Sequence, residues 1–185
     1  RLVTKKNIEQ MTSVGRISNR SKRERSKGVD GMLILAIDPG TTESAYVLLE
    51  KENFSIIKFG KIDNYSMLEI MQEIIFDYYD RGLEIAIEMI QSYGMSVGQE
   101  VFETCVWIGR YTQLAMPMTV KYIYRKEVKL NLCGTVKAKD GNIIQALKDR
   151  FGDKGTKAKK GFFYGFKADC WQVYAVAVTY IDKTA

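Results

Sequence analysis

Three carboxylates lie where apolar segments of this chain begin or end. Asp38 follows the apolar run 33–37, Glu88 follows the run 83–87, and Asp169 opens the last apolar segment. A carboxylate at the end of a buried strand is costly to desolvate unless a cation, a metal ion or an open cleft accompanies it. Three such acids predict one metal site.

The composition narrows the choice of metal. The chain has no histidine, and its three cysteines, Cys105, Cys133 and Cys170, form no C-x-x-C pair. Neither a zinc knuckle nor a disulfide framework fits, so we expect reduced cysteines in the core. Oxygen ligands favour Mg²⁺ or Mn²⁺. Mechanisms that need a histidine base or nucleophile are excluded.

Hydrophobic periodicity predicts the elements that position these acids. The order is three strands in an antiparallel meander, then a helix, a strand, a helix, a strand and three helices. At the start of the first helix, Ser66 and Glu69 are spaced as a capping box. This order predicts an α/β fold, a mixed sheet flanked by helices, in which adjacent parallel strands bring Asp38 and Glu88 together. The predicted ranges are 32–38, 44–50, 54–61, 66–79, 83–88, 96–115, 118–124, 125–131, 139–151 and 169–182.

Length and hydropathy indicate one domain. The 185 residues, 46% hydrophobic, suffice for a single well-buried core. The sequence has neither about 18 consecutive apolar residues nor the apolar core of a secretory signal, so we expect a soluble cytoplasmic protein without membrane contact.

The net charge of +6 is unevenly distributed. Residues 1–31 carry nine basic and three acidic residues, and we expect them to form a disordered basic arm or a non-native extension preceding a domain at 32–185. Segment 32–120 has a net charge of −8, whereas 121–167 has +9. The domain is therefore strongly polarised, with a basic segment suited to phosphate contacts.

Several motifs resemble a known enzyme family. Ile37-Asp38-Pro39-Gly40-Thr41, Ala86-Ile87-Glu88 and the acid opening the last helix resemble ribonuclease-H-like nucleases, and among them the RuvC Holliday junction resolvases. Four segments in the same order resemble RuvC-like proteins from phages and prophages of Gram-positive bacteria: 87–95, 101–110, 138–143 and 171–180. The resemblance covers nearly everything after Met32.

The resemblance implies specific roles for the acids. Asp38, Glu88 and Asp169 would bind Mg²⁺ or Mn²⁺, and two ions about 3.5–4 Å apart could stabilise the attacking and leaving oxygens of a phosphodiester. Cellular RuvC enzymes have a further aspartate one turn after the third acid, but this chain has Gln172 there. Asp140 is a candidate substitute. Purely structural roles remain open for the three acids. Asp38 could form a turn, Glu88 could form an ion pair, and Asp169 could be favoured by the helix dipole.

The resemblance also predicts a nucleic-acid surface. Lys129 and Lys139 would act as catalytic lysines at the scissile phosphate, and Tyr93 would stack on a base at the crossover. Phe162 and Phe163, beside a lysine-rich loop, are read as core anchors. The predicted DNA-binding residues are Tyr93, Arg125, Lys126, Lys129, Lys137, Lys139, Lys157, Lys159, Lys160 and Lys167.

Helix 96–115 is apolar on more than one face. Two readings remain open: burial between two layers, or a homodimer interface matching the twofold symmetry of a four-way junction.

These features predict a Mg²⁺-dependent endonuclease that resolves four-way DNA junctions in recombination or repair, encoded by a phage or prophage and active in the bacterial host's cytoplasm. The alternatives are a nuclease for branched DNA of broader range, a noncatalytic junction-binding protein and, remotely, a fragment of an actin-like ATPase or sugar kinase, because Asp38-Pro39-Gly40-Thr41-Thr42 also resembles a phosphate loop.

Overall fold

The computed structural model describes residues 31–92, 94 and 96–185. The expected basic arm, apart from Gly31, and the predicted stacking residue Tyr93 lie outside the described residues. No helix in the described part is long and apolar enough to cross a membrane.

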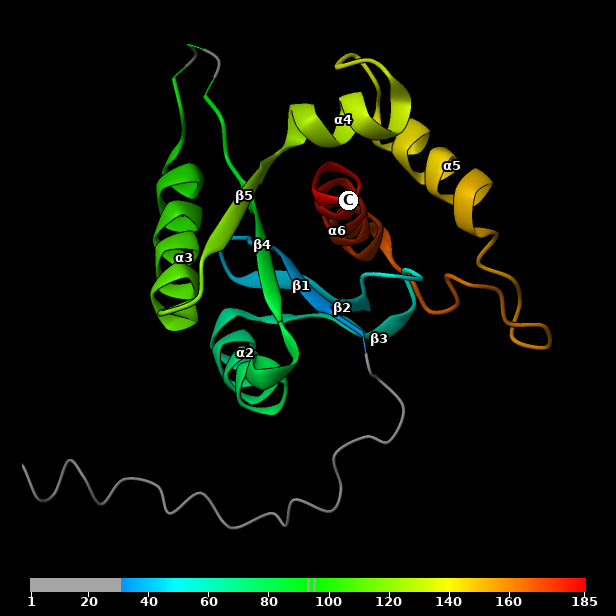
Figure 1. Cartoon of the computed structure of the whole chain (residues 1–185). Coiled ribbons are helices and arrows are strands. Elements are labelled where there is room, and N and C mark those ends of the chain that lie inside the picture. Colours follow the sequence, from blue (N-terminus) through cyan, green and yellow to red (C-terminus); the bar gives the residue numbers. More distant parts are fainter. Residues whose placement is uncertain (1–30, 93, 95) are drawn as a thin grey trace, which may run out of the picture.

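A five-stranded mixed sheet forms the centre of the fold (Figure 1). Its strands are β1 (Leu33–Asp38), β2 (Glu43–Glu50), β3 (Ile56–Asp63), β4 (Glu84–Met89) and β5 (Val120–Tyr124), in the spatial order β3-β2-β1-β4-β5. The first three pair antiparallel, whereas β4 pairs parallel with both β1 and β5. The prediction of a meander followed by parallel strands is confirmed.

Helices cover both faces of this sheet. On one face, α2 (Asn64–Tyr78) and α3 (Gln99–Ala115) pack on Leu33, Leu35 and Ile37. On the other, α6 (Ala168–Thr184) packs on Ile34 and Ala36, with α4 (Arg125–Cys133) and α5 (Asp140–Phe151) outside it (Figure 1). Strand β1 is therefore buried on both faces, as the uninterrupted apolar run before Asp38 indicates.

Helix α2 begins earlier than its sequence pattern predicts. Its N-cap is Asp63, whose Oδ1 accepts hydrogen bonds from the backbone N–H groups of Tyr65 and Ser66. The predicted capping box at Ser66 and Glu69 is therefore wrong: β3 continues to Asp63, so the chain enters the helix directly from the strand. A short 3-10 turn, η2 (Tyr79–Arg81), follows α2.

Helix α3 exposes part of its apolar surface. Phe102 and Val106 are 62% and 60% exposed, Cys105 is also exposed, and Ile108 and Tyr111 on the opposite side are buried. Burial of this helix between two layers is therefore excluded, and the expectation of a core position is wrong for Cys105. All three cysteines are free thiols.

Candidate metal centre

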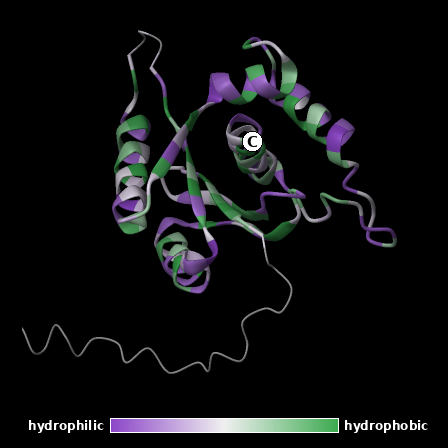
Figure 2. Ribbon diagram, viewed as in Figure 1, coloured by the Kyte–Doolittle hydropathy of each residue, from purple (hydrophilic) through white to green (hydrophobic). Residues whose placement is uncertain are grey.

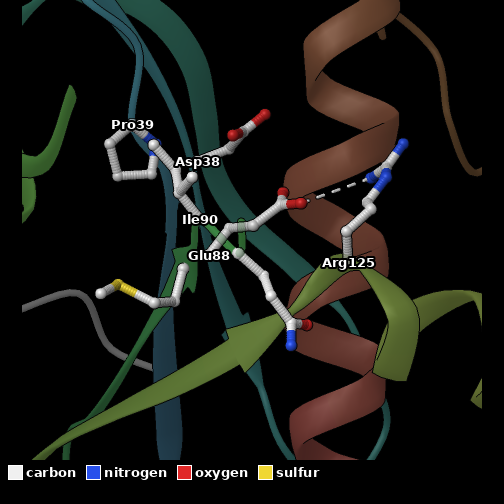
Figure 3. Close-up of a pocket in the computed structure, with 7 residues that line it drawn as sticks. Asp38, Pro39, Glu88, Ile90 and Arg125 are labelled. Atoms are coloured by element: carbon white, nitrogen blue, oxygen red, sulfur yellow. Dashed lines mark ion pairs between the residues drawn. The ribbon is translucent and has the colours of Figure 1, made fainter. Parts of the chain in front are cut away.

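The carboxyl ends of two parallel strands bring Asp38 and Glu88 together. Asp38 is the last residue of β1, and Glu88 follows Ile87, which pairs with Ile37. Both acids line a pocket of about 250 Å³ together with Pro39, Met89, Ile90, Gln91 and Arg125 (Figure 3). The register of β1 and β4 thus explains why acids fifty positions apart in the chain share one site.

The two carboxyl groups strongly perturb each other. Burial is the main reason why the pKa of Glu88 rises to about 8, and the neighbouring Asp38 carboxyl raises it further. Burial likewise raises the pKa of Asp38 to about 6, although the Arg125 guanidinium opposes this rise. Raised pKa values in two adjacent, partly buried carboxyls indicate that the positive charge near them is too small to keep both ionised.

The donors in this pocket fit a hard divalent ion. Asp38 and Glu88 supply carboxylate oxygens, and the side-chain Oε1 of Gln91 is buried with no hydrogen-bond partner among the described residues. Oxygen donors of this kind suit Mg²⁺ or Mn²⁺. A bound cation would also restore the charged form of both acids.

Asp169 does not line the same pocket. It lies in the first turn of α6, and its Oδ2 is 2.8 Å from Nζ of Lys61 on β3, which also approaches Glu43 at 3.2 Å. Its charge nevertheless contributes to the raised pKa of Asp38. Across residues 31–92, 94 and 96–185, no three side chains of His, Cys, Asp or Glu gather closely enough to hold one metal ion. The three-acid cluster is not assembled, and the metal-binding role of Asp169 stays a prediction.

Arg125 is the basic side chain that the structure brings into the pocket. It is the first residue of α4, directly after β5, and its guanidinium Nη1 lies 3.8 Å from Glu88 Oε1 (Figure 3). Its Nη2 lies 2.5 Å from Oδ1 of Asp140, the first residue of α5. Sequence reasoning placed Arg125 on the DNA surface and missed this contact, although its position directly after a parallel strand is the signal that identified the acids.

The predicted catalytic lysines lie elsewhere. Neither Lys129, half-buried on α4, nor Lys139, exposed before α5, lines the pocket. Their roles at the phosphate stay predictions. Of the other predicted DNA-binding lysines, the structure exposes Lys126, Lys137, Lys157, Lys159, Lys160 and Lys167.

Three of these lysines lie in a projecting loop, residues 153–161, which we call the basic loop. An antiparallel bridge between Gly155 and Lys160 closes it, and Figure 2 colours its tip hydrophilic. Its Lys154 instead donates to the Phe166 carbonyl at 2.6 Å. Of the two expected core anchors that follow, Phe163 is fully buried, whereas Phe162 is 38% exposed.

A buried hydrogen-bond network, which the sequence did not reveal, fixes the turn after Asp38. Asn64 Oδ1 accepts from the hydroxyls of Ser44 at 2.6 Å and Tyr111 at 3.1 Å, and Asn64 Nδ2 donates to the Gly40 carbonyl at 3.0 Å. The turn is tight, because a Cβ on Gly40 would lie 2.4 Å from the Glu43 carbonyl oxygen. Helices α2 and α3 therefore hold the loop that carries Asp38.

Gln172, where the resemblance expects a further acid, lies one turn beyond Asp169 on α6. Its Oε1 is buried without a hydrogen-bond partner among the described residues.

Comparison with solved structures reveals the fold. Thermus thermophilus RuvC superimposes with a TM-score of 0.60 and 15% identity, covering 80% of this chain and 92% of its own. T. thermophilus RuvC in complex with Holliday junction substrate gives a TM-score of 0.57 and 14% identity, and the match again covers 80% of this chain and 92% of the RuvC chain. The yeast mitochondrial Holliday junction resolvase has a TM-score of 0.48 and 10% identity, and the match covers 85% of this chain and 81% of the yeast chain.

No protein-family model and no curated protein matches the chain. The fold follows from the first two superpositions together with the strand order. The chain has the mixed-sheet, ribonuclease-H-like fold of RuvC.

Proposed function

We propose that this chain is a divalent-metal-dependent endonuclease that resolves four-way DNA junctions. The observation that carries the proposal is the pair of partly buried acids, Asp38 and Glu88, at adjacent strand ends of a RuvC-like fold. The same fold in T. thermophilus RuvC is known in complex with a Holliday junction substrate. The sequence segments that resemble phage and prophage proteins suggest an enzyme that acts in the cytoplasm of a bacterial host.

In this proposal the pocket binds the metal ion and orients the scissile phosphate. Asp38 and Glu88 hold Mg²⁺ or Mn²⁺, with Gln91 as a neutral oxygen donor. When bound, the ion would lower the pKa of an attacking water and place positive charge beside the phosphate oxygens. Asp169 would join the ligand set if its carboxylate turned away from Lys61, and the hydrogen bond from Asn64 to the Gly40 carbonyl would hold the turn after Asp38.

The basic segment 121–167 binds the DNA backbone. Its exposed lysines provide the phosphate contacts that dominate nonspecific affinity, and the basic loop extends this surface away from the pocket. Lys129 and Lys139 are proposed to approach the strand that is cut.

The exposed stripe of α3 forms a homodimer interface. Phe102, Cys105, Val106 and Gly109 are all exposed and recur at helical spacing. A twofold axis through this stripe would pair it with itself and present two pockets to opposed strands of a junction.

A noncatalytic junction-binding protein is the second candidate. The ion pair between Asp169 and Lys61 favours it, because this contact keeps the third acid from the pair in the pocket. A nuclease with a broader range of branched substrates would use the same chemistry.

Cleavage of a labelled four-way junction, beside a linear duplex of matched sequence, tests the proposal. With Mg²⁺ or Mn²⁺, we expect paired nicks in the junction alone from the wild type and from Glu69→Gln, an exposed control on α2. No nicks are expected with EDTA or from Glu88→Gln, which should still bind the junction. Binding without cleavage in either metal would favour the second candidate, and nicking of several branched substrates would favour the broader nuclease.

A further inference from the structure

Arg125 bridges two carboxylates that belong to different elements. Its Nη1 approaches Glu88 Oε1 on β4 at 3.8 Å, and its Nη2 contacts Asp140 Oδ1 on α5 at 2.5 Å. The side chain is 27% exposed, so the guanidinium lies at the mouth of the pocket rather than in bulk solvent. Figure 3 shows the Glu88 carboxylate pointing toward it.

The backbone of Arg125 is fixed by the start of α4. Glu127 Oε2 accepts a hydrogen bond from the Tyr124 backbone N–H at 2.8 Å, which caps the helix one residue before Arg125. Strand β5, in turn, is paired in register with β4, with Ile123 opposite Glu88. The guanidinium is thus delivered to Glu88 by the sheet itself and held on its outer side by Asp140.

The charges around the pocket call for a single divalent ion. Two carboxylates line the pocket, Asp38 and Glu88. Asp140 and Asp169 lie outside it and are paired with Arg125 and Lys61, and Glu43, which shares Lys61, lies outside it as well. The charge of −2 on the two pocket carboxylates is matched by one Mg²⁺ or Mn²⁺, since charges in a poorly solvated site must be paired.

We infer that the pocket binds one divalent ion between Asp38 and Glu88, and that Arg125 supplies the second positive charge that a two-metal nuclease takes from its second ion. This inference rests on the proposed function. A guanidinium suits the task because it is always charged and its planar fork can keep Asp140 on one edge while donating to a phosphate oxygen from the other. Arg125 is then a catalytic residue that contacts the scissile phosphate.

Binding of two ions would need a different arrangement. Arg125 would have to move away from Glu88, and Asp140 would have to become a ligand of the second ion. The stoichiometry of metal binding therefore separates the two arrangements without any measurement of cleavage.

The test is titration of the full, DNA-free chain with Mn²⁺, followed by calorimetry and by the electron paramagnetic resonance signal of free Mn²⁺. We expect one Mn²⁺ per chain for the wild type, for Arg125→Lys and for the control Lys121→Met, an exposed residue of β5. Arg125→Met should admit a second, weaker ion, because Glu88 and Asp140 lose their cation. In Arg125→Met/Asp140→Asn the second ion should be lost again.

Cleavage of the junction by the same variants gives the second readout. Arg125→Met should lower kcat about 100-fold with little change in DNA affinity, the usual loss when one charge-stabilising donor is removed, and Arg125→Lys should recover part of it. Two Mn²⁺ ions in the wild type, or unchanged kcat in Arg125→Met, would overturn the inference and leave the proposed function standing. No bound ion and no cleavage in the wild type would overturn both.

Discussion

The substitution Glu88→Gln should stabilise the metal-free protein while abolishing its activity. In the folded, metal-free chain Glu88 resists ionisation, chiefly because it is buried and next to Asp38. A glutamine keeps the shape of the protonated side chain and removes the charge. The hydrogen bond with Glu88 lowers the pKa of Asp38 in the wild type, and a glutamine amide can donate to Asp38 in its place, so the substitution relieves Glu88 without removing this support for Asp38.

The sign and size of this change in stability follow from the raised pKa of Glu88. A carboxyl whose pKa rises from 4.5 to about 8 on folding contributes stability that is fully present below pH 4.5 and is lost as the pH rises through 8. At pH 7 the loss amounts to about 3 kcal/mol at 1.36 kcal/mol per pKa unit. Because Asp38 and Glu88 share their protons, we expect Glu88→Gln to recover about 2 kcal/mol, or roughly 4–8 °C in Tm for a chain of this length.

Thermal melts in EDTA from pH 5 to pH 9 measure this effect. Wild-type Tm should fall with rising pH, and the Glu88→Gln profile should be flatter and higher at neutral pH, whereas the control Glu69→Gln should follow the wild type. Mn²⁺ at about 100 times its Kd should raise wild-type stability by about 2.7 kcal/mol and leave Glu88→Gln unchanged. A metal-free Glu88→Gln protein that melts below the wild type at pH 7, with an unchanged pH profile, would refute the electrostatic account of the pocket.

Three other perturbations test the surroundings of the pocket. Asn64→Leu should cost about 1–3 kcal/mol by leaving buried hydroxyls unpaired and should weaken Mn²⁺ binding, since the Gly40 carbonyl loses its donor; unchanged Mn²⁺ affinity would mean that the network does not position Asp38. Alanine at all three basic-loop lysines should lower junction affinity and flatten its salt dependence, and an unchanged salt slope would remove the loop from the DNA surface. Mild oxidation should cross-link the proposed dimer through Cys105, and Cys105→Ser should prevent it; a wild-type chain that sediments as a monomer at micromolar concentration would exclude the α3 interface.

Local patterns in the sequence were enough to predict the pair of acids. Each of Asp38 and Glu88 ends an apolar run, and parallel strands place such ends side by side. The same patterns predicted the mixed sheet. The observed elements differ from the predicted ones at their ends; for example, β3 extends to Asp63, which is also the N-cap of α2.

The partners of these acids could not be predicted in the same way. Lys61 reaches Asp169 from a strand more than a hundred positions earlier, and Arg125 meets Asp140 across two helices. Such contacts depend on side-chain directions that periodicity does not encode. The Asn64 network is similar: its members come from β2, α2 and α3, and none of them has a distinctive spacing.

The two ion pairs near the pocket differ in how readily they can open. Lys61 and Asp169 are 42% and 43% exposed, and an exposed ion pair of this kind is worth at most about 1 kcal/mol. Turning Asp169 toward a bound ion therefore costs little. Arg125 is 27% exposed and is also held by Asp140 at 2.5 Å, so an ion that binds Glu88 leaves the guanidinium with a carboxylate partner. Metal binding is thus expected to draw in Asp169 and to leave Arg125 in place, so the third predicted ligand and the single-ion site are consistent with each other.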